Sequence, residues 1–159
     1  MKQRLFLLAL FCGFSLLAKA ELRADKLAEL DTHLELLLPG TSNAEQSARA
    51  FAKERINELL TKLEGRKLRK KKPSKALSIL EEEVAHRFLV RPTYFADFDQ
   101  LFRAGQYDRT TATALYALAM EYFGLAYKLE VRDADLVLIA LPEAANRALK
   151  LPHKDNWTA

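Results

Sequence analysis

The hydrophobic pattern of the chain changes at Gly124. Before this residue, apolar side chains recur every three to four positions, which is the spacing of one helix face. After it, residues 125–133 alternate apolar and polar side chains, and residues 136–142 form a continuous apolar run typical of a buried strand. Helices followed by strands indicate an α+β fold. We therefore expect a helical layer of about four to five helices packed on a small antiparallel sheet.

Capping signals divide the helical part of the chain. Ser42 or Asn43 favours the start of one helix, Pro73 favours the first position of another, and Gly124 favours the end of the last. The expected helices cover residues 22–38, 44–64, 74–89, about 95–103 and 109–123. In the third of these, Glu81, Glu82 and Glu83 are expected on or beside the outer face.

The first twenty residues have the pattern of a secretory signal peptide. Lys2 and Arg4 precede an apolar run over residues 5–17, and Ala18-Lys19-Ala20 fits a cleavage site. The run has about 13 residues, whereas a membrane span needs roughly 20, so a cleaved signal is preferred to a retained anchor. We expect export to the periplasm or the extracellular space, with no membrane contact beyond export.

Cleavage changes both the charge and the chemistry of the chain. Loss of the signal lowers Lys plus Arg from 25 to 22, against 21 Asp plus Glu, so the net charge is about +1 and no nucleic-acid partner is expected. Cys12, the one cysteine, leaves with the signal, so no disulfide or thiolate is expected. The histidines lack metal-ligand spacing, and no cofactor or metal is predicted.

The mature chain is expected to fold as one domain over residues 21–159. After the signal peptide at 1–20, its expected parts are an N-terminal helical hairpin at 21–65, a basic linker at 66–74, a core at 75–142 and a C-terminal tail at 143–159 with one or two helical turns. The basic run over residues 66–75 has seven Lys or Arg in ten residues. Two interpretations stay open: a solvated linker, or a site for an anionic surface.

The stretch GQYDRTTATALYALAMEYFGLAY, residues 105–127, resembles the central motif of bacterial transglutaminase-like proteins, whose fold is shared with papain-like cysteine peptidases. The matching positions are Phe102, Gly105, Tyr107, Ala112, Thr113, Ala114, Leu115, Tyr116, Gly124 and Tyr127. The segment VAHRFL at 84–89 also resembles the helix that precedes the site in that family. The resemblance covers about 75–142 and implies a reduced transglutaminase-like core.

The catalytic residues that the resemblance implies are not carried over. Arg109 stands at the position of the family's nucleophilic Cys, Asp108 precedes it where Asn is usual, and Asp135 stands at the position of the family's His. Arginine stays protonated and is no nucleophile. We call Arg109, Asp135 and Asp108 the relic site. One hypothesis is an ion pair between Arg109 and Asp135, possible also with Asp108; the alternative is that both face solvent.

Other side chains near the relic site have two interpretations. Thr110, Thr111 and Thr113 are either nucleophiles, which need a base within about 3.2 Å, or capping and packing residues. Phe95, Phe98, Phe102 and Tyr107 either line a peptide groove or pack in the core under a loop.

The sequence thus predicts an exported, catalytically inactive transglutaminase-like domain that serves as a binding or scaffold module in the cell envelope, with an unknown protein or peptide partner. Two alternatives remain: an active hydrolase or acyl-transfer enzyme that uses residues other than Cys, and a plain helical protein of the envelope. Failure of residues 126–141 to pair as strands beside the helix at 109–123 would favour the last.

Overall fold

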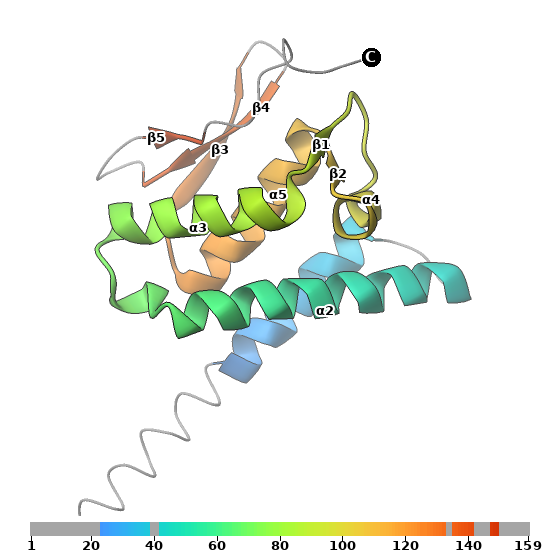
Figure 1. Ribbon diagram of the computed structural model, residues 1–159, viewed down its shortest axis with the longest axis horizontal. Coiled ribbons are helices and arrows are strands. Elements are labelled where there is room, and N and C mark those ends of the chain that lie inside the picture. The colour runs from blue at the N-terminus through green and yellow to red at the C-terminus, as the bar shows by residue number, and fades with distance from the viewer. Residues whose placement is uncertain (1–22, 39–41, 133–134, 142–146, 150–159) are drawn as a thin grey trace, which may run out of the picture.

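The computed structural model describes residues 23–38, 42–132, 135–141 and 147–149. Within them a layer of five α-helices packs beside a small sheet (Figure 1). The helices are residues 23–37, α2 (Asn43–Gly65), α3 (Pro73–Phe88), α4 (Phe98–Arg103) and α5 (Arg109–Phe123), with a 3-10 turn η1 (Leu68–Lys70) between α2 and α3. The predicted α+β class is confirmed, and each predicted helix is present.

The helix ends form where the capping signals predict them. Ser42 and Glu45 form a reciprocal capping box at the start of α2, because the Ser42 N–H donates to Glu45 Oε2 over 2.9 Å and the Glu45 N–H donates to Ser42 Oγ over 3.3 Å. Pro73 occupies the first turn of α3, where its missing N–H needs no partner. Gly124 ends α5 in the left-handed region at φ 68°.

The main sheet has three antiparallel strands in the order β3-β4-β5. β3 (Tyr127–Arg132) pairs with β4 (Asp135–Ala140), with Leu129 opposite Leu138, and β5 (Arg147–Ala148) pairs with the other side of β4. The expected strands at 125–133 and 136–142 are therefore present with slightly shifted ends. β5 corrects the expectation of helical turns after residue 142, since residues 147 and 148 are extended by pairing with β4. The other tail residues lie outside the described ranges.

A second sheet, formed by two strands of two residues each, was not expected from the sequence. β1 (Arg91–Pro92) pairs in parallel with β2 (Gln106–Tyr107). Gly105 makes this approach possible: its φ is +64°, and a Cβ at this position would lie 2.8 Å from Val90 Cγ2. The Gly105 carbonyl also accepts the N–H groups of Val90 and Arg91, over 3.1 and 2.9 Å. The bridge brings the end of α3 close to the start of α5.

One hydrophobic core runs through the helical layer. α5 contacts α3, α4 and β4, and ten of its fifteen residues are buried. Leu30 and Leu34 close the core from the first helix. Phe102 lies edge-to-face against both Phe88 and Phe98, at centroid distances of 5.5 and 5.2 Å. No helix in the described part of the chain is both long and apolar enough to cross a membrane.

Residues 66–72, within the predicted linker of 66–74, form a tight corner between α2 and α3. Leu68 is 1% exposed and belongs to the core, and the N–H groups of Lys70 and Lys71 close the turn on Lys67 and Leu68. The lysines are exposed, as expected of a solvated run. The segment is nevertheless held in place, because an apolar residue in its middle is buried. We call residues 66–75 the basic corner.

Candidate functional site

Asp108 holds the start of α5 and the loop in front of it. Its Oδ1 accepts the Thr111 N–H over 2.8 Å, and its own N–H donates to Thr111 Oγ1 over 3.0 Å, which completes a capping box. Its Oδ2 accepts the Ala96 N–H over 3.1 Å. Asp108 therefore has a structural role that the relic-site interpretation did not foresee.

The loop over residues 93–97, which we call the aromatic loop, exposes apolar side chains. Phe95 is 89% exposed and Tyr94 is 57% exposed, and neighbouring Val90 is 61% exposed. The loop is fixed at both ends, because the Thr93 N–H donates to the Tyr107 carbonyl over 2.8 Å and Ala96 is bound by Asp108. The sequence contained the signal for this feature, five aromatics close together, but gave no indication of which would face solvent.

Arg109 is the first residue of α5 and is partly exposed. Asp135 begins β4, where its backbone pairs with that of Arg132. The side chain of Asp135 lies outside the described part of the structure. The ion pair between Arg109 and Asp135 therefore stays a prediction.

The three threonines of α5 have different surroundings. The Thr111 hydroxyl donates within the capping box and lies 3.0 Å from Asp108 Oδ1, with the residue 6% exposed. Thr113 is 1% exposed, and its hydroxyl has no hydrogen-bond partner in the described structure. Thr110 is exposed. The distance from Thr111 to Asp108 meets the criterion that an enzyme would need, but burial keeps substrates from this hydroxyl.

The predicted groove needs correction at Phe98, Phe102 and Tyr107, whereas its fourth residue, Phe95, is exposed. All three side chains are buried, and Phe102 is enclosed by two other rings. Burial also raises the pKa of Tyr107. Phe98 alone borders an open hollow of about 500 Å³, beside Leu37 and Leu38. The core interpretation thus holds for Phe102 and Tyr107, because both belong to the hydrophobic core.

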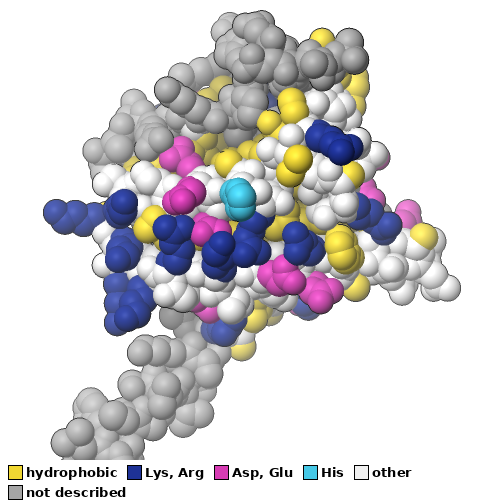
Figure 2. All heavy atoms as spheres, in the orientation of Figure 1, with side chains coloured by type: hydrophobic (Ala, Val, Ile, Leu, Met, Phe, Trp, Pro, Cys, Tyr) yellow, Lys and Arg dark blue, Asp and Glu magenta, His cyan; other side chains and the backbone are white. Residues whose placement is uncertain are grey.

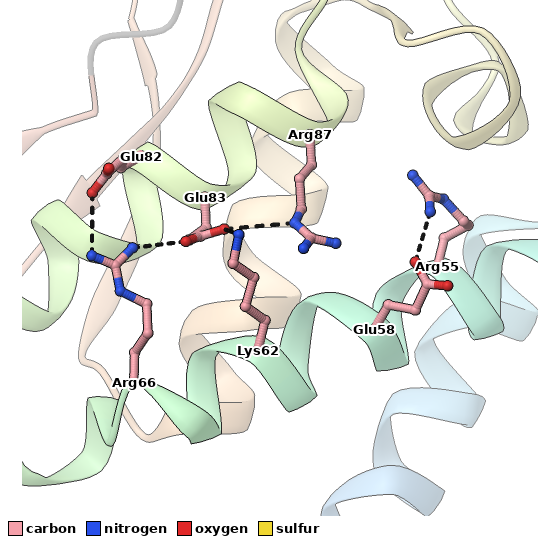
Figure 3. A network of polar contacts seen from close by, with 7 residues as sticks. All are labelled: Arg55, Glu58, Lys62, Arg66, Glu82, Glu83 and Arg87. Carbon is pink, nitrogen blue, oxygen red and sulfur yellow. Dashed lines mark hydrogen bonds and ion pairs between the residues drawn. The ribbon is translucent and has the colours of Figure 1, made fainter.

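A network of charges joins α2 to α3 (Figure 3). Glu83 Oε1 lies 2.7 Å from Arg66 Nη1. Glu83 Oε2 lies 2.7 Å from Lys62 Nζ and 3.5 Å from Arg87 Nε. Burial by itself would raise the pKa of Glu83, but the hydrogen bonds from Lys62 and Arg66 hold it below its ordinary value.

The position of Glu83 corrects the prediction that Glu81, Glu82 and Glu83 all lie on or beside the outer face of α3. Glu83 is buried because it lies three residues after Leu80 and on the side of α3 that faces α2. The spacing of apolar positions on α3 places Glu83 on the buried face. The prediction missed this because it treated the three consecutive glutamates as one exposed group.

A second set of contacts fixes the basic corner on the end of α5. Arg69 Nη2 donates to the Tyr122 carbonyl over 2.7 Å, and its guanidinium lies 5.3 Å and 5.5 Å from the ring centroids of Tyr122 and Phe123. Tyr122 in turn donates its hydroxyl to Glu64 over 2.6 Å. A pocket of about 360 Å³ opens here, and its walls include Arg23, Lys67, Leu68, Arg69, Lys70 and Phe123.

Within the described residues, no group of three or more His, Cys, Asp and Glu side chains could hold a metal ion. No family model, no curated protein and no solved structure matches this chain.

Proposed function

We propose that the chain is an exported, non-catalytic module of the transglutaminase-like kind, which binds a protein or peptide in the cell envelope through its aromatic loop. The observation that carries this proposal is the brace between Asp108 and Ala96. One carboxylate caps α5 and also fixes the loop that exposes Tyr94 and Phe95. The residue that precedes the position of the family's nucleophile here supports an exposed loop.

Two features of the relic site support the absence of catalysis. Arg109, in the position matched to the nucleophile, stays protonated and cannot attack a carbonyl. Asp108 accepts hydrogen bonds from two backbone N–H groups and the Thr111 hydroxyl. These three contacts hold the carboxylate as the cap of α5 and the brace of the aromatic loop.

The exposure of the aromatic loop supports binding. Tyr and Phe side chains are enriched at protein interfaces, because each buries a large area with few rotatable bonds. Here the backbone beneath them is already fixed by hydrogen bonds, which lowers the entropy cost of ordering the loop in a complex. The antiparallel pairing of β3 and β4 beside α5 supports this proposal over a plain helical envelope protein.

A pull-down from envelope extract with the processed protein tests the proposal. We expect a specific partner to be captured by wild type and lost with the double variant Tyr94→Ser/Phe95→Ser. Leu36→Ser is the matched control, since Leu36 is 75% exposed on the first helix. The variant Arg109→Ala shows whether the relic site itself contributes. Equal capture by wild type and the double variant would contradict the aromatic loop as the binding element.

The contact between Thr111 and Asp108 favours one rival, a hydrolase with a threonine nucleophile. That activity requires the Thr111 hydroxyl to become accessible and Asp108 to take its proton. A fluorophosphonate probe followed by peptide mass spectrometry would detect it as a label on Thr111, and Thr113→Val serves as a control on the same helix. We expect no label on Thr111.

A further inference from the structure

We propose that the basic corner is a docking surface for an anionic lipid bilayer. This proposal is independent of the transglutaminase-like resemblance and of the aromatic loop. The sequence predicted no membrane contact beyond export, although a site for an anionic surface at residues 66–75 stayed open as an interpretation. The folded corner changes that expectation, because it gathers the basic run on one fixed surface.

The basic residues of the corner have two different roles. The two arginines hold the corner in place: Arg66 lies 2.7 Å from Glu83, and Arg69 donates to the carbonyl at the end of α5. The remaining basic residues are exposed, and in the described structure none has a carboxylate within ion-pair distance: Lys67, Lys70, Lys71, Lys72 and Lys75. Five ammonium groups therefore face solvent without neutralisation.

The backbone under these lysines is fixed. Lys67 lies in the left-handed region at φ 56°, a strained conformation for a residue with a side chain, and its N–H donates to the Glu64 carbonyl over 2.8 Å. Leu68 anchors the 3-10 turn in the core. No Asp or Glu occurs between residues 65 and 80. Figure 2 shows Lys and Arg side chains gathered at this corner and along the neighbouring surface of α2.

The start of the first described helix favours a bilayer as the partner. Arg23, the first described residue, lines the same pocket as Lys67 and Lys70. Residue 17 ends the apolar run, so only five residues separate that run from Arg23. The first described helix therefore begins at the basic corner, a few residues after a run of the kind that enters the membrane during export. Leu68 and Phe123 give the pocket apolar walls between its cations.

Vesicle binding by the protein as processed in the cell tests the proposal, with its N-terminus read by mass spectrometry. One set of vesicles contains phosphatidylcholine alone; in the other, phosphatidylglycerol replaces part of it. Wild type should bind the anionic set far more tightly, and added salt should weaken that binding. The variant Lys70→Gln/Lys71→Gln/Lys72→Gln should lose roughly a hundredfold in affinity, because each lysine near an anionic surface contributes about fivefold.

A matched control removes the same number of charges elsewhere, with the changes Lys53→Gln, Arg91→Gln and Lys128→Gln. It should keep most of the affinity for anionic vesicles. Equal losses in both triple variants would reduce the effect to net charge and overturn the proposal, as would equal binding to both vesicle sets. Binding to soluble polyphosphate without binding to vesicles would overturn it in favour of a soluble polyanion. Tyr94→Ser/Phe95→Ser should leave vesicle binding unchanged, which separates this test from that of the aromatic loop.

Discussion

Arg66 and Glu83 meet across the interface of α2 and α3, with 2.7 Å between Nη1 and Oε1. The carboxylate is 7% exposed, whereas the arginine is 36% exposed. Loss of either partner therefore has unequal effects. Removal of the cation leaves a buried charge with less support, and removal of the carboxylate leaves cations that can turn toward water.

The first prediction follows from this asymmetry. Arg66→Ala should lower the free energy of unfolding by about 2–4 kcal/mol, and Glu83→Ala by about 1–3 kcal/mol. Urea denaturation measures both values. Glu82→Ala is the control, because Glu82 is 68% exposed and its contact with Arg66 is 3.5 Å, so its loss should cost at most about 1 kcal/mol. An equal cost for Glu82 and Glu83 would contradict the importance of burial.

The second prediction concerns pH. Because the pKa of Glu83 is lower in the folded chain than its ordinary value of 4.5, the folded state favours the ionised form. Its contribution is therefore fully present above about pH 4.5 and is lost as pH falls through the lowered pKa. Urea denaturation at a series of pH values measures the difference in free energy of unfolding between wild type and Glu83→Gln. This difference should be constant from neutral pH down to about pH 4.5 and should then shrink as pH falls further. A stability difference that grows as pH falls would contradict the lowered pKa of Glu83.

The third prediction separates the two roles of Asp108. Asp108→Ala should cost about 1–3 kcal/mol, because it removes both the helix cap and the acceptor for the Ala96 N–H. It should also speed hydrogen exchange at Ala96. Asp108→Asn keeps one acceptor oxygen and should cost less. Asp99→Ala, which removes only a 3.6 Å contact with Arg103, is the control and should leave exchange at Ala96 unchanged.

The fourth prediction concerns the approach of Gly105 to Val90. Gly105→Ala should cost about 2–4 kcal/mol, since an alanine there has both an unfavourable φ and a contact of 2.8 Å with Val90. The double variant Val90→Gly/Gly105→Ala should recover part of that loss, because it removes both Val90 Cγ2 and Val90 Cβ, which lie 2.8 and 2.9 Å from the added Cβ. Thermal denaturation of the four chains gives the coupling. If the double variant regains no stability, the whole loss in Gly105→Ala is due to backbone strain at residue 105.

Sequence signals that act on nearby residues predicted the structure more accurately than features that depend on distant residues. Ser42, Pro73 and Gly124 act on their own backbone or on neighbours within one turn, and they placed helix ends to within a residue or two. Alternation of apolar and polar residues identified β3, and a continuous apolar run identified β4. The two-residue strands β1, β2 and β5 have no period to detect, since they form only because distant residues meet.

Side-chain roles were harder to predict than elements. Asp108 attracted attention as a neighbour of the missing nucleophile, yet its contacts are those of a helix cap and a loop brace. The basic corner looked like a linker because its composition is polar, and a single buried Leu68 changes its character. In both cases the deciding contact joins residues that the sequence does not place together.

α3 connects the two proposed surfaces. It begins inside the basic corner and ends just before the bridge that leads to the aromatic loop. Sixteen helical residues span about 24 Å. If both surfaces are used at once, the helix acts as a spacer of fixed length, and a partner engaged by Phe95 would be held at a set height above the lipid headgroups. Selection among envelope partners would then depend on how far their binding segments stand from the membrane.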